Sequence, residues 1–332
     1  MKNANIAIVG ATGMVGKEIL EILDQRKFPI NSLRLLASKK SAGSMVSFQS
    51  KSLKVEELTE NSFEGIDIAL FSAGGSISEK FAPIAVKAGA VVVDNTSHFR
   101  MDPTVPLVVP EVNKHVLKKH NGIIANPNCS TAQLVMALKP IHDISKIKRL
   151  VISTYQSVSG AGKEAVLELE NQSRFLLKGQ DSEPKEFSHK MPFNVIPQID
   201  VFEDNDYTKE EMKMINETQK ILESNIKITA TAVRVPVFIS HSEAVNIETE
   251  SPISIEKIRE CLSKFEGVSL LDDPSKKEYP TPRDISGKDD VYVGRIRKDV
   301  SNENAIECWI VADNLRKGAA LNAVQIAEEL VK

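Results

Sequence analysis

The chain has 332 residues, of which 42% are hydrophobic and 26% charged, and its formal net charge is -3. This length predicts two domains with apolar cores, and the absence of a basic tract interleaved with aromatics argues against a nucleic-acid partner. There is no span of 18 apolar residues and no signal-peptide core, so we expect neither a membrane span nor secretion. Three widely separated cysteines predict a cytoplasmic protein without a disulfide framework or a thiolate metal site.

Short apolar runs alternate with amphipathic segments through the first third of the chain. The pattern predicts strands over residues 6–9, 33–37, 66–72, 91–94 and 123–125, and helices over 14–25 and 77–88. Strands that alternate with helices are typical of a parallel sheet with helices on both faces. We therefore predict an α/β protein whose N-terminal domain is a Rossmann-like doubly wound sheet.

Longer alternating strands follow a helix predicted over residues 131–142. They span 150–156, 228–237, 244–249, 291–297 and 306–312, and the helices predicted to cover their sheet span 163–178, 209–224 and 255–265. Such alternation indicates an α+β domain with a mostly antiparallel sheet, covered on one face. The predicted domains are 1–128 together with a returning C-terminal helix in 316–332, and 129–315.

A glycine-rich turn, Gly10-Ala11-Thr12-Gly13-Met14-Val15-Gly16, follows the first strand and opens the first helix. Small residues in this position let the main chain approach a pyrophosphate, which the helix N-terminus stabilises. The spacing is displaced from the common Gly-x-Gly-x-x-Gly, so a tight turn without a ligand is the alternative. Ser72-Ala73-Gly74-Gly75, another small-residue turn at the same edge of the sheet, is placed to line the same cofactor.

The end of the second strand indicates which nicotinamide cofactor is used. An acidic side chain there would bind the ribose 2'-hydroxyl of NAD and repel the 2'-phosphate of NADP. The segment 36–41 instead contains Ser38, Lys39, Lys40 and Ser41, without Asp or Glu. These residues favour NADP, although a solvated loop has a similar composition.

Cys129 lies in Asn126-Pro127-Asn128-Cys129-Ser130-Thr131, between the predicted strand 123–125 and the predicted helix 131–142. Main-chain N–H groups at a helix start lower a thiol pKa from about 8.5 to roughly 3.5–7.5. The segment therefore predicts a nucleophilic thiolate. A small buried core residue is the alternative.

A thiolate nucleophile needs a proton donor and acceptor, and His241 in Ser240-His241-Ser242-Glu243 is the first candidate, with His98 the second. Arg234 interrupts an apolar strand, where a guanidinium favours a carboxylate partner. Arg100 follows the carboxyl end of a strand, where open sheets bind ligands. A structural ion pair is the alternative for each arginine.

Seven short motifs then occur in an order that resembles the aspartate-semialdehyde dehydrogenases over essentially the whole chain, most closely the Gram-positive bacterial type. They are Gly-Ala-Thr-Gly-x-Val-Gly, Asp-Asn-Thr-Ser-x-Phe-Arg, Pro-Asn-Cys-Ser-Thr, Ser-Thr-Tyr-Gln-x-Val-Ser-Gly-Ala-Gly, Glu-Glu-Met-Lys, Arg-x-Pro-Val and His-Ser-Glu. The resemblance implies NADPH-dependent reductive dephosphorylation of L-aspartyl 4-phosphate to L-aspartate 4-semialdehyde, through a cysteine thioester. It also implies a role in lysine, diaminopimelate, threonine and methionine biosynthesis, and a homodimer built across the sheet of the second domain.

The resemblance also assigns roles to individual residues. It implies that Cys129 is the nucleophile, His241 the acid and base, and Gln156 a group that holds the substrate near the thiol. The implied substrate-binding residues are Arg234 for the α-carboxylate, Arg100 and Lys213 for phosphate, Glu210 for the amino group, and Asn128. The predicted cofactor-binding residues are Gly10, Thr12, Gly13, Met14, Val15, Ser38, Lys40, Ser41, Ser72, Ala73 and Gly74, and by resemblance Ser159, Gly160 and Asn314.

Asn126 departs from relatives of this type, which often have cysteine at that position. Cys129 is then the only thiol of its motif, which removes a local disulfide as a redox switch. His115 and His120 are five residues apart and do not share a helix face, so no metal site is expected.

Three alternatives remain. One is an N-acetyl-glutamyl-phosphate reductase, although its usual Gly-Cys-Tyr-Pro segment is absent. Another is a catalytically silent NADP-binding regulator, which would be expected to lose Cys129, His241 or Arg234. The last is a cysteine hydrolase, which would not need the Gly10 turn.

Overall fold

The computed structural model describes residues 3–332, and the chain forms two compact units. The first comprises Met1–Asn128 and Ala319–Lys332, and the second comprises Cys129–Gly318. The chain thus leaves the first unit directly before Cys129. It returns to the first unit at Ala319, whereas the predicted returning segment begins at residue 316.

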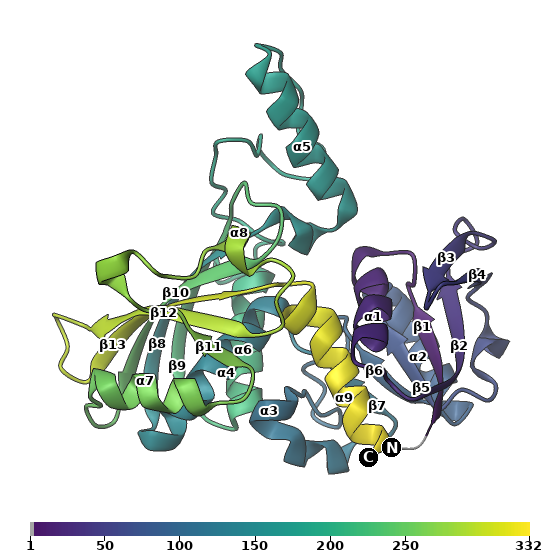
Figure 1. Cartoon of the computed structure of the whole chain (residues 1–332), viewed down its shortest axis with the longest axis horizontal. Coiled ribbons are helices and arrows are strands. Elements are labelled where there is room, and N and C mark those ends of the chain that lie inside the picture. Colours follow the sequence, from purple (N-terminus) through teal and green to yellow (C-terminus); the bar gives the residue numbers. More distant parts are fainter. Residues whose placement is uncertain (1–2) are drawn as a thin grey trace. The chain divides into compact units, whose positions relative to one another are not determined.

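A seven-stranded sheet forms the first unit, in the order β3-β4-β2-β1-β5-β6-β7 (Figure 1). Its strands are β1 (Ala4–Val9), β2 (Ile30–Ala37), β3 (Met45–Phe48), β4 (Lys51–Glu57), β5 (Ile68–Phe71), β6 (Val91–Asp94) and β7 (Ile123–Ala125). All neighbours are parallel except β3 and β4. The prediction of a doubly wound parallel sheet is confirmed, whereas the β3–β4 hairpin was not predicted.

Helices cover both faces of this sheet, which explains why its central strands are apolar on both sides. The helices are α1 (Met14–Gln25), η1 (Glu60–Phe63), α2 (Gly75–Lys87), α3 (Pro110–Asn113), η2 (Lys114–Lys119) and α9 (Leu321–Val331). One apolar cluster joins β1, β2 and β5 to α1 and α9, and another joins their opposite faces to α2. Leu321, Val324 and Ala327 place the C-terminal helix inside the first cluster.

A six-stranded sheet forms the second unit, in the order β11-β12-β13-β10-β8-β9. Its strands are β8 (Ile147–Gln156), β9 (Lys227–Arg234), β10 (His241–Thr249), β11 (Val268–Leu270), β12 (Val291–Lys298) and β13 (Ala305–Ala312). The β8–β9 and β11–β12 pairs are parallel and the other pairs antiparallel. The predicted mostly antiparallel sheet is confirmed.

Three helices, α4 (Cys129–Ile144), α6 (Lys209–Leu222) and α7 (Ile255–Lys264), form one layer against this sheet. The remaining elements of the unit are η3 (Val158–Ala161), α5 (Lys163–Leu177), η4 (Pro274–Lys276), α8 (Pro282–Ile285) and the π-helical turn η5 (Arg316–Ala320). On the opposite face of the sheet Tyr155 is 38% exposed and its ring lies against Trp309.

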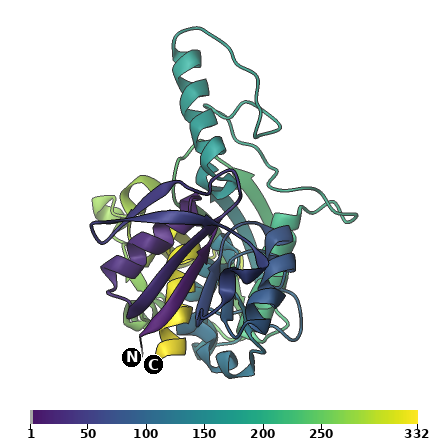
Figure 2. The same cartoon turned by 90° about the vertical axis from the view of Figure 1, so that its right-hand side faces the viewer.

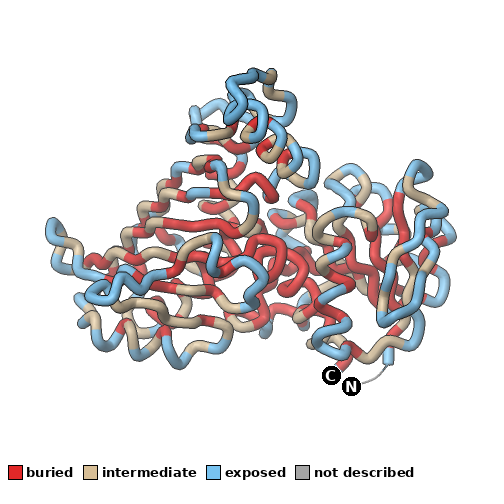
Figure 3. Tube along the Cα trace, turned by 45° about the horizontal axis from the view of Figure 1, so that its top comes forward, coloured by how far each residue is buried: buried red, intermediate tan, exposed pale blue. Residues whose placement is uncertain are grey.

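Helix α5 does not cover the sheet, so the expectation for this segment is wrong. It projects away from the sheet, and the chain that follows it is largely exposed (Figures 1, 2 and 3). Only Ala165, Leu169 and Gln172 of the helix are buried, and they are too few to form a face that could pack on a sheet. Ala165 and Leu169 join a small apolar cluster with Val158 and Met191.

Within residues 3–332, no helix is both long and apolar enough to cross a membrane.

Candidate active site

Cys129 is the first residue of α4, two residues before the expected helix start. The thiol is partly exposed, whereas Ser130 and Thr131 behind it are buried. A Cβ atom built on Gly318 would lie 2.8 Å from the Cβ of Cys129, so only glycine leaves room there. Sequence reasoning did not identify Gly318, because a lone glycine in a helical segment gives no signal of its own.

His241 begins β10 and is fully buried. The main-chain N–H of Ser157 donates to its Nδ1 at 3.0 Å, and the Ser157 hydroxyl oxygen lies at the same distance from that nitrogen. Because the amide N–H can only donate, Nδ1 is the acceptor and the neutral imidazole has its proton on Nε2. Among the described residues Nε2 has no hydrogen-bond partner, so its N–H is available to a bound molecule.

The Ser157 hydroxyl belongs to a buried polar network beside His241. Its oxygen lies 3.0 Å from Ser159 Oγ and 3.2 Å from Asn314 Oδ1, which also accepts from the Ser240 main-chain N–H at 2.9 Å. Ser159 and Asn314, predicted as cofactor-binding residues, therefore also hold the surroundings of the imidazole in place. Ser157 was not predicted as a functional residue.

Burial lowers the pKa of His241 well below its usual value, and the nearby Arg234 guanidinium lowers it further. The imidazole is therefore neutral near pH 7, with the proton on Nε2. A neutral N–H donor in a water-excluded site can stabilise an oxyanion that forms at a reacting carbonyl. The Ser157 main-chain N–H cannot accept from Nδ1–H, so it opposes protonation of the ring, and only the Ser157 hydroxyl oxygen can accept from Nδ1–H.

Gln156 and Arg234 occupy paired positions at the ends of β8 and β9, and both are buried. Gln156 Nε2 donates to Glu210 Oε1 at 3.2 Å, and Arg234 Nη1 donates to the Ser157 main-chain oxygen at 2.6 Å. Burial lowers the pKa of Arg234, while Glu210 and Cys129 act in the opposite direction. The guanidinium, the carboxylate and the thiol therefore lie within electrostatic reach of one another.

Lys213 and Glu210 are three residues apart on α6, and Lys213 Nζ lies 3.2 Å from Glu210 Oε2 and 2.8 Å from Asp200 Oδ2. Burial opposes the charge on Lys213, but attraction to Glu210 and Asp200 outweighs it and raises its pKa. Glu210 is only 5% exposed, so this is not an ordinary surface ion pair. Asp200 was not predicted, since it lies in a polar loop without a motif.

Gly160 borders the same group of side chains. A Cβ atom built there would lie 3.0 Å from Arg234 Nη1 and 3.1 Å from His241 Nε2. The glycine therefore keeps space open directly beside both groups.

Replacing Gly160 by alanine is expected to lower kcat/KM about 10- to 100-fold, because the methyl group displaces the imidazole or the guanidinium by a few tenths of an ångström. Steady-state kinetics measures the loss. Thermal unfolding of the same variant serves as the control, since this overpacking costs about 1–3 kcal/mol and leaves the protein folded. A Gly160→Ala enzyme with unchanged kcat/KM would show that this space is not used.

In the first unit, the two predicted small-residue turns touch. Gly10 has φ +90°, and a Cβ atom there would lie 2.5 Å from the Ser72 main-chain oxygen. A Cβ atom at Gly16 would lie 2.3 Å from the Gly10 oxygen, so α1 packs closely against the turn. Gly74, with φ +97°, precedes α2. The cradle contains main-chain atoms at both helix starts, which suits a pyrophosphate.

Thr12, Met14 and Val15 are partly exposed next to this cradle, and Gly13 and Ala73 are exposed. After β2, Ser38, Lys39 and Lys40 are exposed, and the Ser41 main-chain N–H donates to the Ser38 oxygen at 2.9 Å. This turn presents hydroxyl and ammonium groups without a carboxylate, which suits a 2'-phosphate.

Arg100 is buried, and its guanidinium donates to the main-chain oxygens of Asn126 and Asn95, each at 2.9 Å. The Asn126 side chain donates to Asn95 Oδ1 at 2.6 Å and accepts from Asn322 at 2.6 Å. Arg100 and Asn126 therefore link the ends of β6 and β7 within the first unit. Asn126 replaces a common cysteine with an amide whose oxygen and nitrogen are both hydrogen-bonded. Asn128, next to the nucleophile, is also buried.

His98, the second histidine candidate, is exposed and packs edge-on against Phe99, with ring centroids 4.5 Å apart. Asp94 is the first residue of the Asp-Asn-Thr-Ser-x-Phe-Arg motif that contains His98. It is fully buried and accepts hydrogen bonds from the Ser78 hydroxyl, the Thr96 main-chain N–H and the Thr96 hydroxyl. The Asp-Asn-Thr-Ser segment is therefore held by its own hydrogen bonds.

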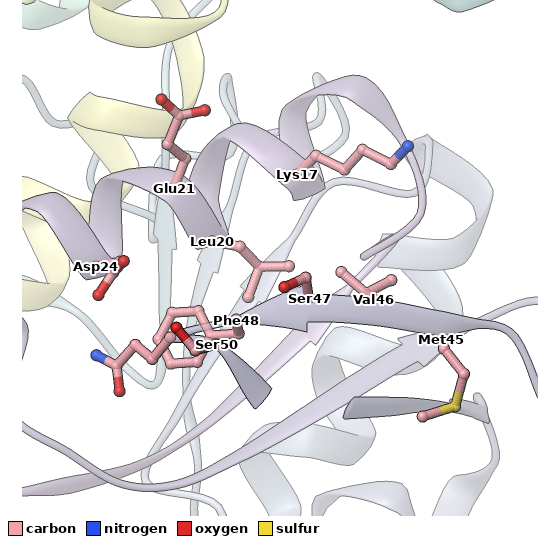
Figure 4. A pocket seen from close by; sticks show the side chains of 10 residues that line it. Lys17, Leu20, Glu21, Asp24, Met45, Val46, Ser47, Phe48 and Ser50 are labelled. Atoms are coloured by element: carbon pink, nitrogen blue, oxygen red, sulfur yellow. The ribbon is translucent and has the colours of Figure 1, made fainter. Parts of the chain in front are cut away.

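A polar cavity of about 580 Å³ lies between α1 and the β3 strand (Figure 4). Lys17, Glu21 and Asp24 line it from the helix, and Ser47 and Phe48 line it from the strand. None of the predicted cofactor-binding residues lines this cavity. Within residues 3–332, no group of three His, Cys, Asp or Glu side chains is arranged to hold a metal ion.

A Rossmann-like unit with a glycine cradle and an α+β unit with a thiol and a buried imidazole, together with the family models that match both, identify the protein as a nicotinamide-dependent dehydrogenase. Residues 5–120 match the model of the semialdehyde dehydrogenase NAD binding domain, and residues 138–317 match the semialdehyde dehydrogenase dimerisation domain. The chain belongs to the aspartate-semialdehyde dehydrogenase family.

Full-length relatives support this assignment. The aspartate-semialdehyde dehydrogenase of Campylobacter jejuni is 55% identical, over 99% of this chain and 97% of its own length. The Vibrio cholerae aspartate semialdehyde dehydrogenase II solved with ASA is 52% identical, with a TM-score of 0.97 over 100% of this chain and 99% of that one. The Candida albicans enzyme solved with NADP is 26% identical, with a TM-score of 0.75 over 98% of each chain. The family and the NADP cofactor inferred from the sequence are confirmed.

Proposed function

We propose that this chain reduces L-aspartyl 4-phosphate to L-aspartate 4-semialdehyde with NADPH, releasing phosphate, in the biosynthesis of lysine, threonine and methionine. The observation that carries the proposal is the environment of the buried His241. Its Nδ1 accepts from the Ser157 main-chain N–H, and its Nε2 and the Arg234 guanidinium both border Gly160. Arg234 is in turn within electrostatic reach of Cys129. A thiol, a proton donor and a carboxylate-binding cation are what an amino-acid acyl phosphate requires.

In the proposed mechanism the Cys129 thiolate attacks the carbonyl carbon of the acyl phosphate. His241 Nε2–H donates a hydrogen bond to the oxyanion that forms, the C–O bond to phosphate breaks, and a thioester remains. NADPH, when bound, supplies the hydride that reduces this thioester. The Nε2–H of His241 hydrogen-bonds to the new thiohemiacetal oxygen and shares its proton with it. The ring recovers that proton fully as the C–S bond breaks, and the aldehyde leaves with Cys129 again a thiolate.

Buried charges hold the substrate in this proposal. Arg234 binds the α-carboxylate, and Glu210, which is paired with Lys213, meets the amino group. Gln156 donates to Glu210 and so orients the amide next to the reacting carbon. Arg100, Lys213 and Asn128 are the proposed phosphate and substrate contacts.

The cofactor is proposed to lie against the cradle formed by Gly10, Thr12, Gly13, Met14 and Val15, with Ser72, Ala73 and Gly74 opposite. Ser38, Lys40 and Ser41 would bind its 2'-phosphate. Ser159, Gly160 and Asn314 are proposed to meet its nicotinamide part.

Replacing Lys40 by alanine is expected to raise the KM for NADP about three- to tenfold with little change in kcat, because an exposed ammonium–phosphate contact is screened by solvent and modest in energy. Initial rates at varied NADP and at varied NAD measure the effect. Lys51→Ala, at an exposed lysine of β4, is the matched control. An equal loss with NAD would contradict a role at the 2'-phosphate.

The function is tested by absorbance at the NADPH band with aspartate semialdehyde, phosphate and NADP. The assay is run beside the N-acetylated substrate that is longer by one carbon. We expect reduction of NADP with the first substrate alone, and only when phosphate is present. Activity with the second substrate alone would instead assign an N-acetyl-glutamyl-phosphate reductase. Binding of NADP without either activity would indicate a regulator.

We also propose a cytoplasmic homodimer that forms across the open face of the second sheet. Tyr155 and Trp309 give this face an aromatic patch, and a cavity of about 400 Å³ lined by Tyr279, Pro280 and Trp309 lies on it. Aromatic side chains are enriched in the cores of interfaces. Sedimentation of Trp309→Glu, compared with the parent protein, tests the interface, and an unchanged dimer would exclude this face.

A further inference from the structure

The Glu243 carboxyl is fully buried and has no role in the mechanism above. It lies on β10, two residues after His241 and on the same face of the strand. Within the described part of the chain, neither of its oxygens makes a hydrogen bond of ordinary geometry. Buried polar groups are nearly always paired, so this carboxyl needs an explanation.

The side-chain amide of Gln133 lies next to the Glu243 carboxyl. Gln133 lies one helical turn after Cys129 on α4, so both side chains are on one side of the helix. Its Nε2 donates to the main-chain oxygen of His241 at 3.4 Å, and its Oε1 is buried without a donor among the described residues. The cross-strand partners of Glu243 are Thr154 of β8 and Ile310 of β13.

Burial raises the pKa of Glu243 well above its usual value, although the amide of Gln133 acts in the opposite direction. The other titratable group that faces it is Cys308 of β13, whose pKa is raised first by burial and further by Glu243. The carboxyl is therefore neutral and has an O–H to donate. The buried acceptor beside it that lacks a donor is Gln133 Oε1.

We propose that Glu243 is a positioning residue of the active site, whose neutral carboxyl pairs with the Gln133 side-chain amide, accepting from its N–H and donating O–H to its Oε1, and thereby holds this amide on the His241 main chain. The pair links the first turns of α4, with the nucleophile, to the start of β10, with the imidazole. This inference rests on the proposed function, because the distance between Cys129 and His241 matters for catalysis only if these two residues are the nucleophile and the acid and base. Neither Glu243 nor Gln133 touches the reacting atoms.

Two substitutions of Glu243 separate the neutral donor from the charge. Glu243→Gln keeps the shape and an N–H donor, so its kcat should remain within about threefold of the wild type. Glu243→Leu keeps the volume and removes the donor, so kcat should fall about 10- to 100-fold through misplacement of the reacting groups. KM should be unchanged, since the substrate-binding side chains are not altered.

Gln133→Leu and the double variant Glu243→Leu/Gln133→Leu test whether the two residues act together. We expect the double variant to lose no more kcat than either single variant, because one link is broken in each case. These variants also carry the test if Glu243→Leu fails to fold.

Unfolding at different pH values gives a second readout. Since the folded pKa of Glu243 is raised above the unfolded value, its contribution to stability is complete below about pH 4.5 and is lost as the pH rises. Glu243→Gln lacks this loss, so its free energy of unfolding should exceed that of the wild type by an amount that grows with pH.

The proposal is overturned if Glu243→Gln loses as much kcat as Glu243→Leu, which would mean that the carboxylate charge is needed. It is also overturned if Glu243→Leu, or Gln133→Leu in its place, retains full kcat. A wild-type protein that forms no NADPH from aspartate semialdehyde and phosphate would instead refute the proposed function.

Discussion

Replacing Cys129 by alanine is expected to abolish phosphate-dependent reduction of NADP, with a loss in kcat/KM of at least about 10⁴-fold, because removal of a covalent nucleophile leaves only binding and electrostatic stabilisation. Aspartate semialdehyde, phosphate and NADP are the reactants in the assay. Cys129→Ser tests the same point with a side chain of similar shape, and it should be nearly as inactive because a hydroxyl ionises far less readily than a thiol.

Cys261→Ala is the matched control for this experiment. Cys261 is half-buried in α7, and burial raises the pKa of its thiol, so its removal should leave kcat/KM unchanged. The Cys129→Ala protein should also bind NADP as the wild type does, because the proposed dinucleotide cradle is in the other unit. Retention of substantial activity by Cys129→Ala would refute the thioester mechanism.

Replacing His241 by glutamine is expected to lower kcat about 10²- to 10⁴-fold, the usual effect of removing a general acid and base. Iodoacetamide should still alkylate Cys129 in this variant, which shows that the nucleophile is intact. His98→Gln is the matched control, since the His98 ring is exposed and packs edge-on against Phe99. Equal losses in the two variants would contradict the assignment of His241.

The stability of the same variants should depend on pH in a defined direction. Burial, and then Arg234, place the folded pKa of His241 well below 6.5, so the unfolded chain binds a proton that the folded chain does not. The free energy of unfolding of the wild type should therefore fall as the pH is lowered below about 6.5, and His241→Gln should lack this part of the fall. Urea unfolding at pH 5.5 and 7.5 measures the difference, and identical slopes in both proteins would contradict it.

The sequence predicted those elements whose apolar pattern is strong. Helix α1, strand β6 and strand β7 have the predicted bounds, because each is an apolar run or stripe flanked by glycine, asparagine or polar residues. The β3–β4 hairpin is mostly exposed and has no such run, so its residues gave no signal. The extent of α5 was predicted nearly correctly but its place was not, since periodicity indicates which face is apolar and not what lies against it.

The candidate site was predictable where chemistry depends on a side-chain type. Cys129, His241, Arg234, Gln156 and Glu210 all lie in the second unit, on or beside the ends of β8, β9 and β10 and the starts of α4 and α6. The sequence could not indicate hydrogen bonds made by main-chain atoms or space left open by a missing side chain. The Ser157 N–H, the space at Gly318 and the space at Gly160 belong to this group. Asp200 and Glu243 are further cases, because a loop carboxylate is common and a buried one is recognised only when its surroundings are known.

The hydrogen bond from the Ser157 main chain to His241 makes the choice of imidazole tautomer tolerant of mutation. Every residue except proline has a main-chain N–H, so a change of the Ser157 side chain leaves this donor in place. By contrast, a single substitution of Ser157 by a residue other than threonine removes the hydroxyl that can accept from the charged ring. Random mutation at this position should therefore yield many variants that retain the neutral ring in its working orientation, and selection for activity would separate them by how readily the ring is protonated.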